Sequence, residues 1–180
     1  MTVYKLADIS NIASEKIFID ANILISLDSP HPYFSDSFPA CLAARNIFLE
    51  NKTNLFVDIV VLSEFYNRCL KASYNFYCST NGLNPKKFTF KKYRKTEDYK
   101  INLEQTCSKI QNILQYANAI NPNYPESVFI SNIIPANFKN LDFNDLHILF
   151  VCLHNNFCLW TNDIDFKNQP IDIFTENVNY

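Results

Sequence analysis

The residues of this chain that could do chemistry are carboxylates, and they fall where predicted strands end or predicted helices begin. Asp20 closes an apolar run, Glu64 lies in the predicted first turn of the helix after the second strand, and Asp163 follows a later apolar run. In an open parallel sheet the carboxyl ends of the strands meet at one edge, which is where ligands bind. We therefore expect these acids to gather at that edge: Asp20, Glu64, Asp142, Asp145, Asp163 and Asp165.

Carboxylates that share one edge repel each other, which raises their pKa values and destabilises the fold unless a positive charge neutralises them. A divalent cation does this. The chain has only three histidines and no H-E-x-x-H pattern, so the donors are oxygens, which suit Mg²⁺ or Mn²⁺ rather than zinc. Such ions stabilise the transition-state charge of a phosphodiester and generate hydroxide from bound water.

A structural explanation of the acids stays open beside the chemical one. Aspartate is a preferred helix N-cap, and acids in the first helical turn are favoured by the helix dipole. Asp142 followed by Asp145 fits a cap and a first-turn acid, so Asp142 either joins a metal site or only caps the helix that carries Asp145.

The pattern of apolar residues predicts the elements that would position these acids. Short apolar runs predict strands, and apolar residues three and four positions apart predict helices. Strands that alternate with helices favour an α/β fold with a parallel sheet whose strands are covered on both faces. The predicted strands are 16–20, 55–57, 157–161 and 171–175. The predicted helices are 21–27, 38–52, 60–77 and roughly 96–120, and residues 141–156 are predicted to be a loop, a cap and a helix.

Composition excludes several other classes of protein. The single glycine, Gly82, excludes the glycine-rich phosphate-binding loops. Six cysteines without a C-x-x-C pair indicate reduced, mostly buried thiols. A hydrophobic content of 48% with a net charge of −2 excludes a disordered chain. The N-terminus lacks the apolar run of a signal peptide, and we find no uncharged apolar stretch long enough to span a bilayer, so we expect a soluble, cytoplasmic protein with no membrane partner.

A basic segment in the middle of the chain predicts a nucleic-acid surface. Seven of the 16 lysines and arginines lie in residues 86–100. Lysine and arginine bind phosphates, and aromatic rings stack on unpaired bases. We call the cations Lys86, Lys87, Lys91, Lys92, Arg94 and Lys95 the basic patch; Phe88, Phe90 and Tyr93 are interleaved with them. The alternative is a solvated surface loop.

Taken together, the acids and their surroundings resemble the PIN-domain nucleases, a family that includes the ribonuclease toxins of bacterial toxin–antitoxin pairs. The matching segments are IFIDANILI (17–25), VVLSEFYNR (60–68) and DFNDLHILFVCLHNNFCLWTNDIDF (142–166). The resemblance aligns the acids of the family with Asp20, Glu64, Asp145 and Asp163, a frequent extra acid with Asp165, and two polar residues near the metal with Asn22 and Thr161.

This resemblance implies a three-layer α/β/α domain over residues 1–180 with about five short parallel strands. Residues 73–135 would be a helical and basic extension, because they are longer than a compact PIN domain needs. Mg²⁺ or Mn²⁺ would be held by Asp20, Asp145, Asp163 and Asp165, with Glu64 positioning or deprotonating the attacking water. Asn22 and Thr161 would orient ligands. The expected activity is endoribonuclease cleavage of RNA that leaves a 5′-phosphate. The expected partners are an antitoxin that blocks the acidic edge and a second copy of the chain.

Three other functions compete with a toxin. A phosphatase or phosphotransfer domain also ends its first strand in Asp, but the phosphatase pattern is D-x-D-x-T, and here Asn22 stands two positions after Asp20. A PIN-like module that only binds RNA or protein would usually lack one of the four acids. A housekeeping RNA-processing nuclease would share every residue of the site.

Overall fold

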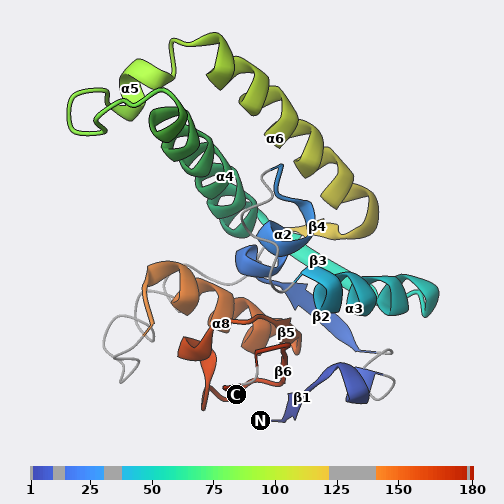
Figure 1. The fold of residues 1–180 in the computed structure, drawn as a ribbon. Coiled ribbons are helices and arrows are strands. Elements are labelled where there is room, and N and C mark those ends of the chain that lie inside the picture. Colours follow the sequence, from blue (N-terminus) through green and yellow to red (C-terminus); the bar gives the residue numbers. More distant parts are fainter. Residues whose placement is uncertain (1, 10–14, 31–37, 122–140, 178) are drawn as a thin grey trace.

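A single parallel sheet organises the molecule (Figure 1). The computed structural model describes residues 2–9, 15–30, 38–121, 141–177 and 179–180. Within these residues the sheet has six strands in the order β1-β6-β5-β2-β3-β4, and every neighbouring pair is parallel. The strands are β1 (Val3–Tyr4), β2 (Lys16–Ile19), β3 (Asn54–Asp58), β4 (Asn118–Ile120), β5 (Cys158–Trp160) and β6 (Ile173–Phe174).

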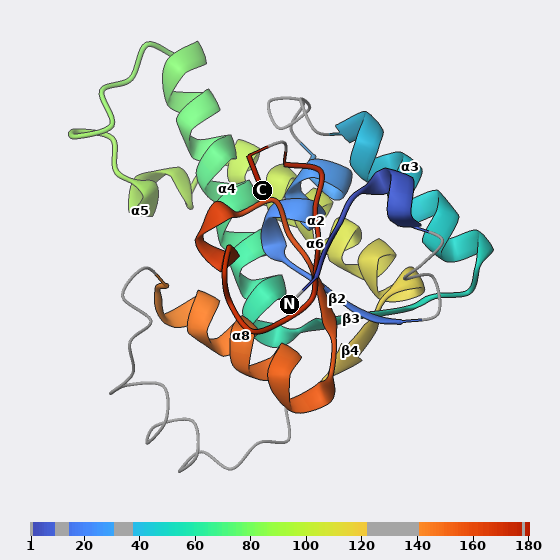
Figure 2. The same ribbon diagram turned by 90° about the horizontal axis from the view of Figure 1, so that it is seen from below.

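Helices cover both faces of this sheet (Figures 1 and 2). α8 lies on one face, while α2 lies on the other, where it packs against α3, α4 and α6. The helices are α2 (Ala21–Asp28), α3 (Phe38–Glu50), α4 (Ile59–Thr80), α5 (Phe90–Tyr93), α6 (Glu97–Tyr116) and α8 (Phe143–Asn155), with short 3-10 turns η1 (Leu6–Asp8) and η3 (Ile164–Phe166). The predicted α/β class with a parallel sheet between helical layers is confirmed.

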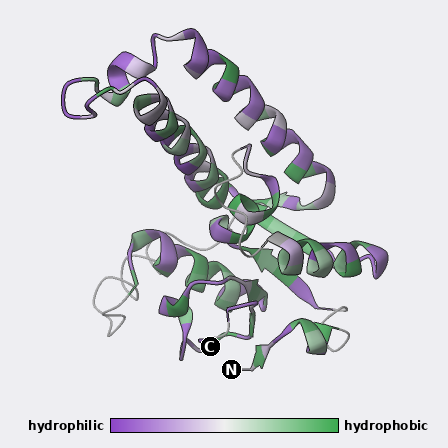
Figure 3. Ribbon diagram, in the orientation of Figure 1, coloured by the Kyte–Doolittle hydropathy of each residue, from purple (hydrophilic) through white to green (hydrophobic). Residues whose placement is uncertain are grey.

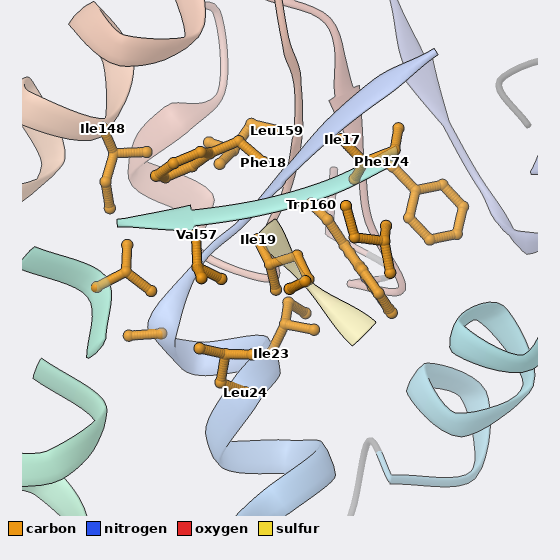
Figure 4. Close-up of a cluster of buried hydrophobic side chains, with 14 of the residues drawn as sticks. Ile17, Phe18, Ile19, Ile23, Leu24, Val57, Ile148, Leu159, Trp160 and Phe174 are labelled. Atoms are coloured by element: carbon orange, nitrogen blue, oxygen red, sulfur yellow. The ribbon is translucent and has the colours of Figure 1, made fainter. Parts of the chain in front are cut away.

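The core follows from the alternation of side chains along each strand. In Figure 4, Phe18 and Leu159 face Ile148 of α8, whereas Ile19 and Trp160 point to the opposite side, toward α2. Trp160 has no exposed surface, and its ring meets Phe48 of α3 edge-on at 5.3 Å. Because helices cover both faces of the sheet, its central strands consist largely of apolar residues, which are green in Figure 3.

The sheet has six strands where about five were expected; β1 and β4 were not predicted, because neither lies in an apolar run of its own. One predicted element was wrong. β4 occupies the end of the range 96–120, which was predicted to be helical throughout; α6 ends at Tyr116, and Ala117 is extended with φ −121° and ψ 134°.

Beyond the sheet, α4 and α6 form a long helical hairpin with α5 at its tip (Figure 1). A second apolar cluster holds the tip together; its buried members are Leu70, Tyr74, Cys78, Tyr93 and Tyr99. Ile113 and Ala117 at the other end of α6 belong to the sheet core, and β4 pairs with β3. The described part of residues 73–135 is therefore built into the fold at its C-terminal end; residues 122–135 lie outside the described residues.

The rings of the basic segment are packing residues, which corrects the prediction that all three are free to stack on bases. Tyr93 has no exposed surface, and its hydroxyl donates to Asp98 at 2.6 Å. Phe88 and Phe90 are half-buried and pack against the same cluster. By contrast, all six cations of the basic patch are exposed.

The six cysteines are thiols, five of them buried and Cys107 exposed, as the sequence predicted. No described helix has the length and apolar character needed to cross a bilayer.

Candidate functional site

Asp20 sits where β2 passes into α2, at the carboxyl edge of the sheet. Its backbone N–H donates to the carbonyl of Trp160 at 3.0 Å, which continues the sheet hydrogen bonding, and its own carbonyl begins the hydrogen bonds of α2. Although Asp20 holds the N-cap position, its side chain makes no capping hydrogen bond to the helix within the described residues. The capping role that usually explains such an aspartate does not explain this one.

The carboxylate of Asp20 is instead held by two polar side chains. Thr161, just after β5, donates its hydroxyl to Oδ2 of Asp20 at 2.6 Å, and Asn22 donates its amide to the same oxygen at 2.6 Å. Asn22 also donates to the Thr161 hydroxyl at 2.9 Å. These contacts fix a carboxylate that is only 5% exposed at the junction of two neighbouring strands.

Asp163 follows the same strand end. Its backbone N–H donates to the Thr161 hydroxyl at 3.0 Å, and its Oδ1 accepts from the amide of Asp165 at 3.0 Å, so that it caps η3. Asp163 is half-buried and Asp165 is exposed at the rim. The hydroxyl of Tyr180 donates to the backbone carbonyl of Asp163.

Asn162, between Thr161 and Asp163, is a supporting residue that the sequence reasoning missed. Its backbone N–H donates to Oδ1 of Asn22 at 3.1 Å, and its side-chain oxygen accepts from the hydroxyl of Thr175 at 3.1 Å. These bonds tie the loop after β5 to the ends of β2 and β6. The run T-N-D at 161–163 was its only signal in the sequence.

Glu64 is the sixth residue of α4, which begins at Ile59, so it lies in the second turn of the helix and not in the first turn as predicted. Its carboxylate accepts from Arg68 at 3.4 Å and from the side-chain amide of Asn144 at 3.3 Å. Asn144 belongs to α8, so Glu64 links the two helices that flank the site. Asn144 was not predicted; its position directly before Asp145 was the available hint.

Asp142 and Asp145 form a capping box at the start of α8. Asp142 Oδ1 accepts from the backbone amides of Asn144 at 2.8 Å and Asp145 at 3.0 Å, while Asp145 Oδ2 accepts from the Asp142 amide at 3.1 Å. The carboxylate of Asp142 is exposed and engaged as the cap. Asp145 is half-buried.

The pKa values of Asp20 and Asp145 show that the acids of the site interact electrostatically with one another. The pKa of Asp20 is raised to about 7, chiefly by burial; the negative charges of Glu64 and Asp163 contribute to the rise, and the hydrogen bond from Thr161 opposes it. The pKa of Asp145 is raised to about 6, again chiefly by burial, with contributions from the charges of Asp142, Asp163 and Asp165. Asp163 therefore interacts with both of the perturbed carboxylates.

The donor set fits a hard cation in its chemistry. Carboxylate, hydroxyl and amide oxygens at this edge are the ligands that Mg²⁺ accepts, and Mg²⁺ usually binds one or two carboxylates while keeping several waters. Among the described residues, no three histidine, cysteine, aspartate or glutamate side chains are grouped closely enough to hold a metal ion between them.

A buried pair behind the site was also missed. Asp58, at the end of β3, has no exposed surface; its Oδ2 lies 2.5 Å from Nε2 of His147 in α8, and its Oδ1 caps α4 by accepting from Val61 at 3.0 Å. His147 is thus a buried, bonded residue, consistent with a packing role. The pair ties α8 to the start of α4, and so sets where Glu64 stands relative to Asn144.

The basic patch lies away from these acids, at the tip of the helical hairpin (Figure 1). The ammonium of Lys92 is used locally and donates to the carbonyl of Lys87 at 2.8 Å. RNA binding by the patch stays a prediction.

Comparison with known proteins yields a likeness of fold. No protein-family model matches the sequence, and no curated protein matches it. The crystal structure of VapBC2 from Rickettsia felis, bound to a DNA fragment from its promoter, is similar with a TM-score of 0.56 at 18% sequence identity, over 89% of this chain and 98% of that chain.

Replacing Asp20 by asparagine is expected to stabilise the metal-free protein, and increasingly so as the pH rises. The native state retains a proton up to about pH 7 that the unfolded chain loses near its ordinary pKa of 3.8, so the free energy of unfolding falls between these values. Asparagine does not suffer this loss, which predicts a gain of about 2–4 kcal/mol, or roughly 5–10 °C in Tm, at pH 8, about a third of that gain at pH 5 and little gain near pH 3.5.

Thermal melts of both proteins in a chelator across this pH range provide the measurement. Glu104→Gln, at an exposed position of α6, is the control and is expected to follow the parent. A difference between Asp20→Asn and the parent that is the same at every pH would contradict the assignment.

The buried pair should matter more to stability than the exposed cap. Asp58→Ala leaves His147 without its buried partner and removes a cap, for an expected loss of about 3–5 kcal/mol. Asp142→Ala removes only an exposed cap, for a loss of about 1 kcal/mol. Urea denaturation at neutral pH measures both, and equal losses would show that the pair does not anchor α8.

Proposed function

We propose that this protein is a metal-dependent endoribonuclease that hydrolyses RNA phosphodiester bonds, and that it is the toxin of a type II toxin–antitoxin pair. The strongest support is the position of Asp20: its carboxylate is buried at the sheet edge, does not cap its helix, and has a pKa raised mainly by burial and further by the charges of Glu64 and Asp163. A buried carboxylate of this kind lowers the stability of the folded protein when it is ionised. A bound cation would neutralise its charge and so offset this cost.

The residues would divide the work by position. When bound near Asp20, Asp145 and Asp163, with Asp165 at the rim, Mg²⁺ or Mn²⁺ would supply charge stabilisation for the phosphate and acidify a bound water. Glu64 is partly exposed and would orient or deprotonate the attacking water. Thr161 and Asn22 hold the Asp20 carboxylate in one orientation through their hydrogen bonds.

The partner proposal draws on the similar fold. VapBC2 is a toxin–antitoxin complex, and it was solved on promoter DNA. By analogy, we propose a small antitoxin that inserts an arginine or lysine among the carboxylates, a homodimer as the working assembly, and the cytoplasm as the site of action.

The contacts of Asn22 argue against the alternative that this protein is a phosphatase. A phosphatase places a second aspartate two positions after the first, to act on the leaving group. Here that position holds Asn22, whose amide donates to the carboxylate of Asp20 and to the hydroxyl of Thr161. Asn22 supports the first acid and carries no proton for a leaving group.

Purified protein is expected to cleave single-stranded RNA with Mg²⁺ or Mn²⁺ and to stop when a chelator is added. Asp20→Asn and Glu64→Gln should each lower the rate about 100-fold or more, since one loses a ligand charge and the other a general base. Glu104→Gln, purified in parallel, should cut like the parent. Cleavage by Asp20→Asn at the parental rate would exclude the proposal.

Mn²⁺ is expected to raise the Tm of the parent protein at pH 8, by an amount equivalent to about 2.7 kcal/mol when its concentration is 100 times the dissociation constant. Asp20→Asn and Asp163→Asn should lose most of this stabilisation, and Glu64→Gln should keep it while losing cleavage. A non-catalytic module that only shares the fold would show no metal-dependent shift in any of these proteins.

A further inference from the structure

A groove of about 800 Å³ runs from the candidate site along α4 toward α5. Ile59, Val60 and Ser63 line it at the start of α4, Glu64 and Asn144 line the part beside the candidate site, and Phe90 of α5 lines its other end. Among the described residues, the groove therefore adjoins the candidate site and leads away from it along the helical hairpin.

One face of α4 forms the wall of this groove. Glu64, Asn67, Arg68 and Lys71 all line it, and their spacing of three and four residues places them on the same side of a helix. Seven residues separate Glu64 from Lys71, which corresponds to about 10 Å along the helix axis. The wall thus passes from an acid at the site to two cations within two turns.

The two cations differ in how they are held. Arg68 is half exposed, and its guanidinium lies 3.4 Å from the Glu64 carboxylate, a loose contact in a solvated setting. The ammonium of Lys71 lies over the rings of Tyr74 at 4.8 Å and Phe90 at 6.0 Å. Aromatic faces attract a cation without neutralising it, so Lys71 is positioned and keeps its charge for a ligand.

Phe90 is also fixed in orientation. Its ring meets Tyr74 edge-on at 5.5 Å and Tyr99 edge-on at 6.2 Å. The ring is half-buried, so part of it remains available to the groove. A rigid aromatic surface next to a fixed cation is what a nucleotide needs: an apolar contact for its base and a counter-charge for its phosphate.

We propose that this groove binds the stretch of single-stranded RNA that adjoins the scissile phosphate, with Arg68 and Lys71 on backbone phosphates and Phe90 against a base. The assignment rests on the proposed nuclease function, because continuity with the carboxylates orients the strand. The two cations of the wall beyond Glu64, Arg68 and Lys71, complement a phosphate backbone. The other occupant to consider is an extended protein segment, and the test below distinguishes it from RNA.

We choose Lys71 for the test, because Arg68→Ala would also remove the contact between Arg68 and the Glu64 carboxylate and so alter the candidate site. RNA binding is measured by fluorescence anisotropy with a labelled single strand of about twelve nucleotides, using the full chain in chelator so that the strand stays intact. Lys71→Ala is expected to weaken binding about three- to tenfold and to reduce the slope of log affinity against log salt by about 0.7, the value for one phosphate contact on a single strand. Lys71→Arg should restore both.

Two further variants complete the design. Phe90→Leu keeps the apolar bulk but removes the ring, so affinity should fall while the salt slope stays unchanged. Lys109→Ala is the matched control: Lys109 belongs to α6 and lines a different groove that shares no residue with this one. Its affinity and slope should equal those of the parent. Thermal melts of each variant verify folding.

The outcomes separate this inference from the nuclease proposal. If the parent cleaves RNA but Lys71→Ala matches Lys109→Ala in affinity and salt slope, the groove does not bind RNA and the nuclease proposal stands. If Lys71→Ala and Phe90→Leu lose affinity as expected but the parent never cleaves with Mg²⁺ or Mn²⁺, the groove inference stands and the activity is wrong. Unchanged RNA binding in all groove variants would leave a protein segment as the occupant.

Discussion

One buried carboxylate dominates the electrostatics of the candidate site. Asp20 ends the central strand and is removed from water by the elements around it, so its charge is costly unless nearby groups compensate. Thr161 and Asn22 supply hydrogen bonds, yet burial and the charges of Glu64 and Asp163 still hold its pKa near 7. The sheet edge therefore holds carboxylates with strongly perturbed pKa values, which are common at functional sites.

Helix α4 links this edge to the rest of the protein. Its start is fixed by Asp58, which caps the helix and also binds His147 of α8. Its first turns carry Glu64 into the site, and its later turns enter the second apolar cluster with α5 and α6. The same helix thus positions a reactive acid, lines a groove with cations and supports the hairpin tip, because its successive faces meet different neighbours.

Local patterns were enough to predict the class of fold and the elements around the acids. The apolar runs that end at Asp20 and near Asp163 stand out because parallel strands covered on both faces must be apolar throughout. β1 and β4 were missed because neither lies in an apolar run of its own; β4 directly follows α6 and was included in the predicted helix. Tyr93 of the basic segment was misread because sequence does not distinguish a ring that packs from one that is exposed.

The sequence by itself determined that carboxylates follow the strands of a parallel α/β protein, since residue type and periodicity are local properties of the chain. Only the tertiary structure decided what each acid does with its oxygens. Asp142 serves as a helix cap while Asp20 does not, Asn144 reaches Glu64 from another helix, and Asp58 meets His147 across 89 positions of the chain. These outcomes depend on strand register and on how helices cross the sheet. Such contacts join residues far apart in the chain, so no local window contains them.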